Sequence, residues 1–559
     1  MTDFKPFTAY IVDACRTAGG KRNGRLSGYH PAELGATVCD ALIERTKVKA
    51  AEVEDVIFGC VSQVGAQSGN IGRGVVLSSR HLPESVPGQS VDRQCGSSQQ
   101  AIHAAAQAVM SGVHDCCIAG GVEVMSQVPI GASIIDGLKA GHGNPMSDAT
   151  MEKYAEKMKA FEQFNMSSQA FSQFGGAELL AKKYGLSRED VDKFAAISQQ
   201  RAVTSTQAGK FADEIVPLPV KRKEGQSEGM HTQDEGIREG VTVESVAKLK
   251  AMFPNGVLTP ASSSQICDGA AAVLICNERG LAKLGVQPLA RIHSLALAAA
   301  DPVIMLEAPI PATQKALQKA NMKIQDVDVY EVNEAFASVP LAWCKALGAD
   351  FQKLNVNGGA MALGHPLGGT GAKLMTTLVH ELRRRQGRFG LLAICEGGGT
   401  ANATVASILR GMGRNTHSSS CCQLQNFKPT CCPSSAELEM VLVGQAGRVV
   451  KGSELFANMI LAPFLSRFMC MCAGYGAPAE TPVDKQVPPA KAKTGLSDPK
   501  APTLLQKQSR REVHIDKTTT IPLELYWELI RAGERAKERG QHQLTKGTRH
   551  VGMHLIMST

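Results

Sequence analysis

The sequence lacks the regular cysteine spacing of a disulfide-stabilised protein, although its 559 residues include 16 cysteines. Disulfide scaffolds are short chains with cysteines at conserved spacings, and this long chain has no such framework. The adjacent pairs Cys421-Cys422 and Cys431-Cys432 also lack the Cys-x-x-Cys spacing of a zinc site. We therefore expect a reducing, intracellular environment and no bound metal.

The first part of the chain lacks an excess of charge of either sign. The net charge is +8, but residues 1–412 carry 41 Lys and Arg against 40 Asp and Glu, whereas residues 413–559 carry 19 against 12. A nucleic-acid-binding domain carries a basic patch or stripe. The balanced charge of residues 1–412 argues against nucleic acid as a partner.

The sequence also lacks a leader-like segment and a long apolar run. The start Met1–Pro6 has neither the apolar core of a signal peptide nor the Arg- and Ser-rich pattern of a transit peptide, and Met557–Thr559 is not a peroxisomal Ser-Lys-Leu signal. The apolar stretch 453–471 is interrupted by Pro463 and Arg467 and is too short to span a bilayer. We expect no membrane span and a cytoplasmic location, with mitochondrion and peroxisome as open alternatives.

What the sequence does contain is an alternation of short apolar runs and helical patterns, which predicts a layered α/β fold with a largely buried sheet. This alternation covers residues 8–120 and resumes from Gly269 to about Met412. The second part repeats the order of the first, as two similar halves of one unit would. We expect an N-terminal half made of residues 1–126 and 266–285, and a C-terminal half made of residues 286–412.

Residues 127–265 do not show this alternation. They contain loops rich in Gly, Ser and Met, helical patterns at 170–184 and 187–209, and a charged loop at 221–240. The second helical pattern begins with a capping box, Ser187 to Asp190. We expect an insertion that lies over the N-terminal half. A lid over an active site and a passive structural insertion are both open interpretations.

The last part of the chain, residues 413–559, is expected to form a linker and a poorly ordered tail of unknown function. Residues 478–502 are rich in Pro, Lys and Ala, a composition typical of disorder. Residues 522–540 have the pattern of an amphipathic helix.

Cys95 stands at the start of a helical segment with almost no polar face, because eight of the ten residues 101–110 are apolar or small. Such a helix is buried in a large protein. The positive end of the helix dipole would lower the pKa of a thiol at this place toward the thiolate, which is the nucleophilic form. The alternative is that Cys95 is a small core residue, because free cysteine is often buried.

Four stretches together carry the residues of a possible active site: Cys95-Gly-Ser-Ser98, Asn333-Glu-Ala-Phe-Ala337, Gly364-His365-Pro366 and Cys395-Glu-Gly-Gly-Gly399. Each alone is ordinary. Together with residues 358–368 and 262–272, they resemble the thiolase family, the acyl-CoA C-acyltransferases, over about residues 5–412. The resemblance implies an α/β fold with five layers (αβαβα), two similar halves and an inserted lid.

The resemblance also implies a role for each site residue. Cys95 would be the acylated nucleophile, His365 the base that takes its proton, and Cys395 the second acid and base. His365 and a water bound to Asn333 would stabilise one oxyanion, and the backbone N–H groups of Cys95 and Gly397 the other. Coenzyme A thioesters would be the substrates, with no metal or redox cofactor.

Substrate-binding residues are carried over from the same resemblance. Arg238 and Ser245 lie in a segment similar to the coenzyme A-binding segment of the family, and Ser264 lies in its Ser-Ser-Gln-Ile turn. Phe174 stands where short-chain biosynthetic thiolases place a methionine beside the acyl group. For Arg238, a solvated side chain without a ligand is the competing interpretation.

The chain departs from the short-chain biosynthetic thiolases at Ser98, Glu396, Thr259-Pro260 and Gln173-Phe174. These departures leave the chain length of the substrate open. The Gln173-Phe174 pair and the run Arg93–Gln100 resemble degradative thiolases more, and a dedicated acetoacetyl-CoA synthase stays an alternative. Condensing enzymes that decarboxylate their substrate share the fold but carry histidine where Cys395 stands. A catalytically silent binder of coenzyme A esters is the alternative outside enzymes. The resemblance favours a homodimer or a homotetramer.

Overall fold

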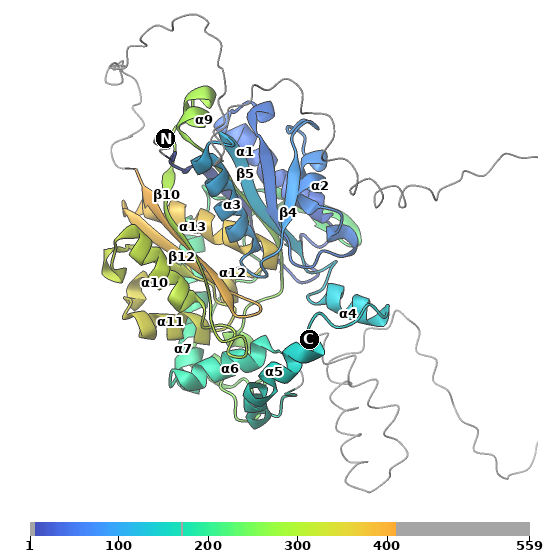
Figure 1. The fold of residues 1–559 in the computed structure, drawn as a ribbon, viewed down its shortest axis with the longest axis vertical. Helices are drawn as coiled ribbons and strands as arrows, with labels where there is room; N and C mark the ends of the chain where they lie inside the picture. Colours follow the sequence, from blue (N-terminus) through green and yellow to red (C-terminus); the bar gives the residue numbers. More distant parts are fainter. Residues whose placement is uncertain (1–5, 169–170, 410–559) are drawn as a thin grey trace, which may run out of the picture. The chain divides into compact units, whose positions relative to one another are not determined.

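A computed structural model describes residues 6–168 and 171–409 of the chain. The predictions for the tail, residues 413–559, lie outside the described residues. Figure 1 shows an α/β molecule in which helices surround the strands, and strands from the first and the last part of the described chain belong to one sheet. No helix among the described residues is long and apolar enough to cross a membrane.

The strands form one continuous ladder that joins the two predicted halves. Its order is β11-β12-β13-β10-β1-β9-β5-β3-β4, with short strands β2 and β6 attached to β9 and β1. The strands of this ladder are β1 (Tyr10–Thr17), β2 (Gly20–Lys21), β3 (Asp55–Gly59), β4 (Gly88–Val91), β5 (Cys116–Val124), β6 (Ile215–Val216), β9 (Cys267–Cys276), β10 (Ala290–Ala299), β11 (Val329–Val332), β12 (Phe389–Glu396) and β13 (Thr400–Ile408). The two parts meet where β1 pairs with β10 through only two residue pairs.

Helices cover both faces of each half of the ladder. The helices outside the insertion are α1 (Pro31–Thr46), α2 (Ile71–Ser78), α3 (Ser97–Ser111), α9 (Glu278–Leu284), α10 (Pro309–Ala320), α11 (Ser338–Leu347), α12 (Ala360–Leu363) and α13 (Thr370–Arg384). Helices α1 and α2 pack on the outer face of β3, β5 and β9, and α10 and α11 pack on the outer face of β11, β12 and β13.

Helices α3 and α13 form the middle layer. One hydrophobic cluster contains residues of both helices together with inward residues of strands from both halves, such as Ile57, Val273 and Ile394. The layers therefore run helix, sheet, helix, sheet, helix, as the resemblance implied. The buried character expected for the helix after Cys95 is confirmed, because nine of its fifteen residues are buried and Gln107 and Ser111 are its exposed positions.

Residues 127–265 contribute the remaining elements: helices α4 (Ala132–Lys139), α5 (Asp148–Met158), α6 (Gln173–Lys183), α7 (Arg188–Gln207) and α8 (Val243–Ala247), and strands β7 (Leu218–Arg222) and β8 (Gly225–His231). The predicted capping box is present, because Ser187 and Asp190 bond each other's backbone N–H groups. The prediction of a charged loop at 221–240 is wrong over β7 and β8, which form a hairpin. Much of this hairpin is exposed, so it has few buried positions to produce an apolar alternation.

A buried ion network ties this segment to the central layers. Arg16 of β1 donates to Glu214 at 2.6 Å and to both carboxylate oxygens of Asp234 at 2.8 and 3.1 Å. Lys373 of α13 lies 3.5 Å from the same Asp234 carboxylate. All four side chains are almost fully buried, so removing one charge leaves others uncompensated in a medium of low dielectric constant.

We predict that Arg16→Met destabilises the protein by about 3–5 kcal/mol, because Glu214 and Asp234 would keep their charges without a partner. Denaturant unfolding followed by circular dichroism measures this. The control is Arg279→Met, whose ion pair with Asp115 has 52% and 26% exposed side chains and should cost at most about 1 kcal/mol. If the two substitutions lower the free energy of unfolding equally, the buried network contributes no more to stability than an exposed ion pair.

Candidate active site

Cys95 lies in a tight turn just before α3. The residue before it, Gln94, has a φ of +48°, a conformation that residues other than glycine rarely adopt. The Ser97 hydroxyl secures this turn, because it accepts a hydrogen bond from the Arg93 N–H at 2.9 Å and donates one to the Gln94 carbonyl at 2.5 Å. The Cys95 side chain is 4% exposed. The turn therefore fixes a thiol that water barely reaches.

The pKa of Cys95 is not lowered as the helix position predicted. Burial raises this pKa well above its ordinary value, and the negative charges of Cys395 and Glu396 add to the rise, while the backbone N–H of Cys95 acts in the opposite direction. Loss of hydration disfavours the charged form, and here it outweighs what one helix terminus provides. Cys95 is therefore a thiol near neutral pH and needs a base to become a nucleophile.

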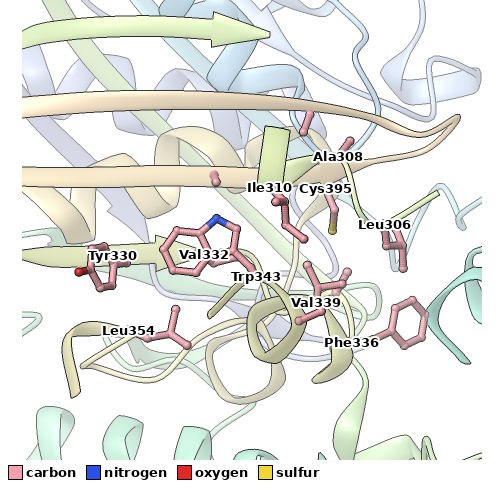
Figure 2. Packing of buried hydrophobic residues seen from close by; sticks show 14 of the residues in the cluster. Leu306, Ala308, Ile310, Tyr330, Val332, Phe336, Val339, Trp343, Leu354 and Cys395 are labelled. Atoms are coloured by element: carbon pink, nitrogen blue, oxygen red, sulfur yellow. The ribbon is translucent and has the colours of Figure 1, made fainter. Parts of the chain in front are cut away.

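Cys395 lies next to the end of β12 and is 1% exposed. Figure 2 shows it at the side of the hydrophobic cluster where Leu306 and Val339 lie. Burial and the charge of Glu396 raise its pKa to about 12, although a hydrogen bond from the Asn333 amide favours the thiolate. Because the charge of Cys395 also raises the pKa of Cys95, the two sulfur atoms lie within electrostatic reach of each other.

His365 has its two ring nitrogens in different roles. Its Nδ1 lies 2.7 Å from the Thr370 hydroxyl, and that hydroxyl donates its own hydrogen to the Pro366 carbonyl at 3.0 Å. The Thr370 oxygen must therefore accept from Nδ1–H, which leaves Nε2 without a proton. Nε2 lies 3.4 Å from the Asn333 amide nitrogen. His365 thus presents an unprotonated nitrogen toward the residue that also bonds Cys395.

Burial and the positive charge of Lys373 keep this imidazole neutral, because they lower the pKa of His365 to about 3. The loop that carries it is held from two sides. The buried Glu123 carboxylate accepts the Gly368 N–H at 2.9 Å, and the Lys373 ammonium donates to the carbonyls of Leu363 and Gly364. His365 is therefore a neutral base in a fixed position.

A single hydrogen bond joins the turn of Cys95 to the helix that follows His365. The Ser98 hydroxyl accepts the Ala372 N–H at 2.9 Å, and Ala372 lies in the first turn of α13, where N–H groups have no partner within the helix. Ser98 is one of the departures from the short-chain biosynthetic thiolases, and here it caps α13 from α3.

The structure brings Cys95, Cys395, Asn333 and His365 together through these contacts. Gly397 also lies beside this group, because a Cβ atom built on it would come within 3.0 Å of the Gln94 side chain. The roles assigned to these five residues remain predictions, since a role in catalysis is not a geometric property.

Two of the predicted substrate-binding residues lie beside this group. The Ser264 N–H donates to the Ala335 carbonyl at 2.9 Å, directly after Asn333 and Glu334. Phe174 packs edge-on against Phe336 at 5.4 Å between ring centroids, and both belong to the hydrophobic cluster that contains Cys395.

The other two predicted residues, Arg238 and Ser245, show no contact with the group. Ser245 is exposed and forms the capping box of α8 with Thr242. The Arg238 side chain is exposed and flanks a surface cleft of about 310 Å³ lined by Arg25, Glu235, Glu239 and six further residues. The three carboxylates in this lining, Asp234, Glu235 and Glu239, do not favour the phosphates of coenzyme A. The assignment of both residues to coenzyme A remains a prediction.

No group of three or more His, Cys, Asp or Glu side chains with the arrangement of a metal site occurs within residues 6–168 and 171–409. The cysteines in these ranges are free thiols.

Sequence reasoning did not identify Gln94, Thr370, Lys373 and Glu123 as residues that shape the site. Gln94 has no sequence signal, because glutamine is not a residue type typical of positive φ. Thr370 follows His365 by five residues on the next helix, a spacing that could have been tested against the need for an Nδ1 partner. The partners of Glu123 are up to 245 residues away, so no local pattern could have found it.

Comparison with known proteins identifies the family of the chain. Residues 9–279 match the family described as thiolase, N-terminal domain, and residues 286–408 match thiolase, C-terminal domain. The steroid 3-ketoacyl-CoA thiolase FadA6 of Mycobacterium tuberculosis is 48% identical over 399 residues, which are 71% of this chain and 93% of that protein. The acetyl-CoA acetyltransferase of Pseudomonas aeruginosa is 41% identical over 391 residues, which are 70% and 96% of the two chains.

Among solved structures, the crystal structure of the Bacillus anthracis acetyl-CoA acetyltransferase is similar with a TM-score of 0.64 and 33% sequence identity, and the match covers 72% of this chain and all of that one. The chain belongs to the thiolase family. The predictions of the family, of its layered α/β fold and of an acyltransferase enzyme are therefore confirmed.

We predict that Thr370→Val lowers kcat about tenfold to a hundredfold and changes KM little, because the His365 ring loses the acceptor that fixes its tautomer. This loss is no larger than the lower end of the ~10²–10⁴-fold that a positioned base contributes. Steady-state kinetics with a 3-oxoacyl-CoA measures both constants. Thr370→Ser keeps the hydroxyl and should retain most of the activity. A fully active valine variant would mean that Nδ1 needs no partner.

Proposed function

We propose that this thiolase cleaves a 3-oxoacyl-CoA with free coenzyme A through an acyl group on Cys95, and that it also runs the reverse condensation. The observation that carries this proposal is the contact path from His365 through Asn333 to Cys395, beside the Cys95 thiol. A nucleophile, a neutral base and a second proton donor are the parts that such a transfer requires.

In the first half-reaction, Nε2 of His365 takes the proton of the Cys95 thiol, and the sulfur attacks the C3 carbonyl of the 3-oxoacyl-CoA. The tetrahedral intermediate collapses, the C2–C3 bond breaks, and its electron pair moves to C2. Cys395 gives its proton to C2, and acetyl-CoA leaves. A thiol with a pKa of about 12 suits this step, because it still carries its proton when the carbanion forms.

In the second half-reaction, the Cys395 thiolate takes the proton of the coenzyme A thiol. The coenzyme A sulfur attacks the acyl carbonyl, the bond to the Cys95 sulfur breaks, and Cys95 recovers its proton from the His365 imidazolium. Every side chain then has the protonation state with which it started. Coenzyme A and its thioesters enter only as substrates, so this scheme includes no separate cofactor.

Both half-reactions pass through an oxyanion that needs donors already in position. The Asn333 Oδ1 atom is buried and has no hydrogen-bond partner among the described residues. It can accept a hydrogen bond from a water molecule that also donates to an oxyanion. We assign the second set of donors to the backbone N–H groups of Cys95 and Gly397.

We propose a degradative role on acyl groups longer than acetyl. Phe174 packs against both Phe336 and Phe253, with ring centroids 5.4 and 6.1 Å away, and such an aromatic wall suits an apolar acyl chain. The relative from Mycobacterium tuberculosis is named for steroid 3-ketoacyl-CoA, and a 40% identical relative from Marinobacter nauticus is named 3-ketoacyl-CoA thiolase. Dedicated synthesis of acetoacetyl-CoA is the alternative, since other relatives are named acetyl-CoA acetyltransferase.

Cys95→Ser tests the chemistry. The wild type should thiolyse acetoacetyl-CoA or longer 3-oxoacyl-CoAs, followed as loss of the enolate absorbance, and should be labelled covalently by the acyl group. The serine variant should remain folded and lose the label, because a hydroxyl is far less acidic than a thiol. Labelling that persists would place the nucleophile elsewhere, and a wild type without turnover on any chain length would favour a silent binder.

Thiolysis rates over 3-oxoacyl-CoAs of increasing length separate the two roles. A kcat/KM that rises beyond the four-carbon substrate supports the degradative role. A rate confined to acetoacetyl-CoA supports the biosynthetic alternative.

The proposal includes a homodimer or a homotetramer, as the family resemblance implies. Strand β4 ends the ladder and its residues are half-buried or exposed, so one edge of the sheet is available for contact with a second copy. Light scattering coupled to size exclusion should give two or four times the mass of one chain.

We also propose that residues 127–265 act as the lid that binds coenzyme A, and that the enzyme is complete without residues 413–559. Deleting residues 413–559 should leave kcat/KM within about twofold of the full chain, because the family matches end at residue 408. Circular dichroism checks that the shortened protein folds. A folded but inactive protein would contradict this boundary.

A further inference from the structure

Glu396 is a buried carboxyl group next to both thiols that the proposed reaction does not use. It follows Cys395 directly in β12, so its side chain points to the opposite face of the strand. The side chain is 0% exposed. Its Oε2 atom accepts a hydrogen bond from the Thr400 hydroxyl at 2.6 Å, and its Oε1 atom is buried without a partner among the described residues.

The carboxyl group packs directly on the turn of the nucleophile. A Cβ atom built on Gly96 would lie 1.9 Å from Oε1 and 2.7 Å from Cδ of Glu396, so any larger residue after Cys95 would displace this carboxyl group. The Glu396 carboxyl group thus packs against the backbone between Cys95 and α3. The same negative charge raises the pKa of both Cys95 and Cys395.

Few other charged groups face Glu396. From the segment before α3, the charge of Arg93 favours the ionised carboxylate, although the buried Nε atom of Arg93 has no hydrogen-bond partner among the described residues. On the neighbouring strand β13, the backbone of Asn402 donates to Glu396. His103 of α3 bonds the Asn402 side chain at 3.1 Å and is neutral, because burial lowers its pKa to about 3.

Burial raises the pKa of Glu396 to about 7, against the Thr400 hydrogen bond and the Arg93 charge. Its carboxyl group therefore changes charge near neutral pH. A carboxylate with no partner on one oxygen is costly to ionise in a closed interior, which agrees with this direction.

We propose that Glu396 is a positioning residue whose carboxyl group, packed on Gly96, adjusts the two catalytic thiols: the carboxylate opposes the formation of each thiolate, and the neutral acid does not. This inference rests on the proposed function of Cys95 and Cys395. It predicts that ionisation of Glu396 lowers the reaction rate above neutral pH, because the carboxylate opposes the thiolate that each half-reaction forms.

Alkylation of Cys95 tests this without turnover. The full-length protein is treated with iodoacetamide between pH 5.5 and 9, and the Cys95 peptide is quantified by mass spectrometry. In the wild type, the logarithm of the alkylation rate of Cys95 should rise with pH, flatten near pH 7 as Glu396 ionises, and then rise again. We call the flat part the shoulder. Above it, the rate should be about tenfold lower than the extrapolated low-pH line, since a nearby charge shifts a pKa by roughly one unit.

Glu396→Gln keeps the shape of the side chain and the acceptor for the Thr400 hydroxyl but never ionises. The alkylation rate of Cys95 in this variant should therefore rise with pH without the shoulder. The kcat/KM of this variant relative to wild type should be near one at pH 6 and rise to about tenfold at pH 8.5. A purely structural role would change this ratio equally at every pH. The matched control is Glu331→Gln, because Glu331 is also buried with an unpartnered Oε1 and does not act on either thiol.

Thr400→Val is a second variant that leaves Glu396 itself in place. The lost hydrogen bond favours the neutral acid, so the shoulder should move to higher pH. A shoulder that persists in Glu396→Gln overturns the proposal. If that variant does not fold, an unmoved shoulder in Thr400→Val overturns it and a moved one supports it. If the shoulder depends on Glu396 but the protein shows no thiolase turnover, the effect of Glu396 on the thiols stands and the proposed function is rejected.

Discussion

The close approach of α3 and α13 is the constraint on which the rest of the site depends. Both helices begin in the middle layer, and their first turns meet where the Ser98 hydroxyl accepts the Ala372 N–H. A glycine makes this approach possible, because a Cβ atom on Gly371 would lie 2.2 Å from the Gln99 nitrogen. On the other side of α3, a Cβ atom on Gly59 of β3 would lie 2.4 Å from the Ser98 nitrogen. The turn of Cys95 and the loop of His365 therefore form one rigid unit.

Burial then determines the electrostatics of this unit. It keeps Cys95 and Cys395 protonated and His365 neutral, so these three side chains carry no charge at rest. A low-dielectric site of this kind strengthens every later interaction with developing charge. Glu396 is the exception, because its carboxyl group titrates near neutral pH. The charge state of the site thus depends on one residue that the chemistry itself does not need.

Sequence patterns predicted helices and strands well where buried residues recur at regular spacing or where the whole element is buried. The strand β12, the buried helix α3 and the capping box at Ser187 follow from local composition. The hairpin of β7 and β8 was missed, because much of it is exposed and has little alternation. The lowered pKa expected for Cys95 was wrong, because a helix start is visible in sequence whereas the depth of burial around a thiol is not.

The sequence by itself determined the family and the layered fold class, and it predicted which three side chains react, since motifs such as Gly364-His365-Pro366 carry both residue type and order. Only the tertiary structure decided the tautomer of His365 through Thr370, the capping of α13 by Ser98, and the packing of Glu396 on Gly96. The last two join residues about 270 to 300 positions apart along the chain. Such contacts depend on how the layers stack, and no local pattern of residues records that.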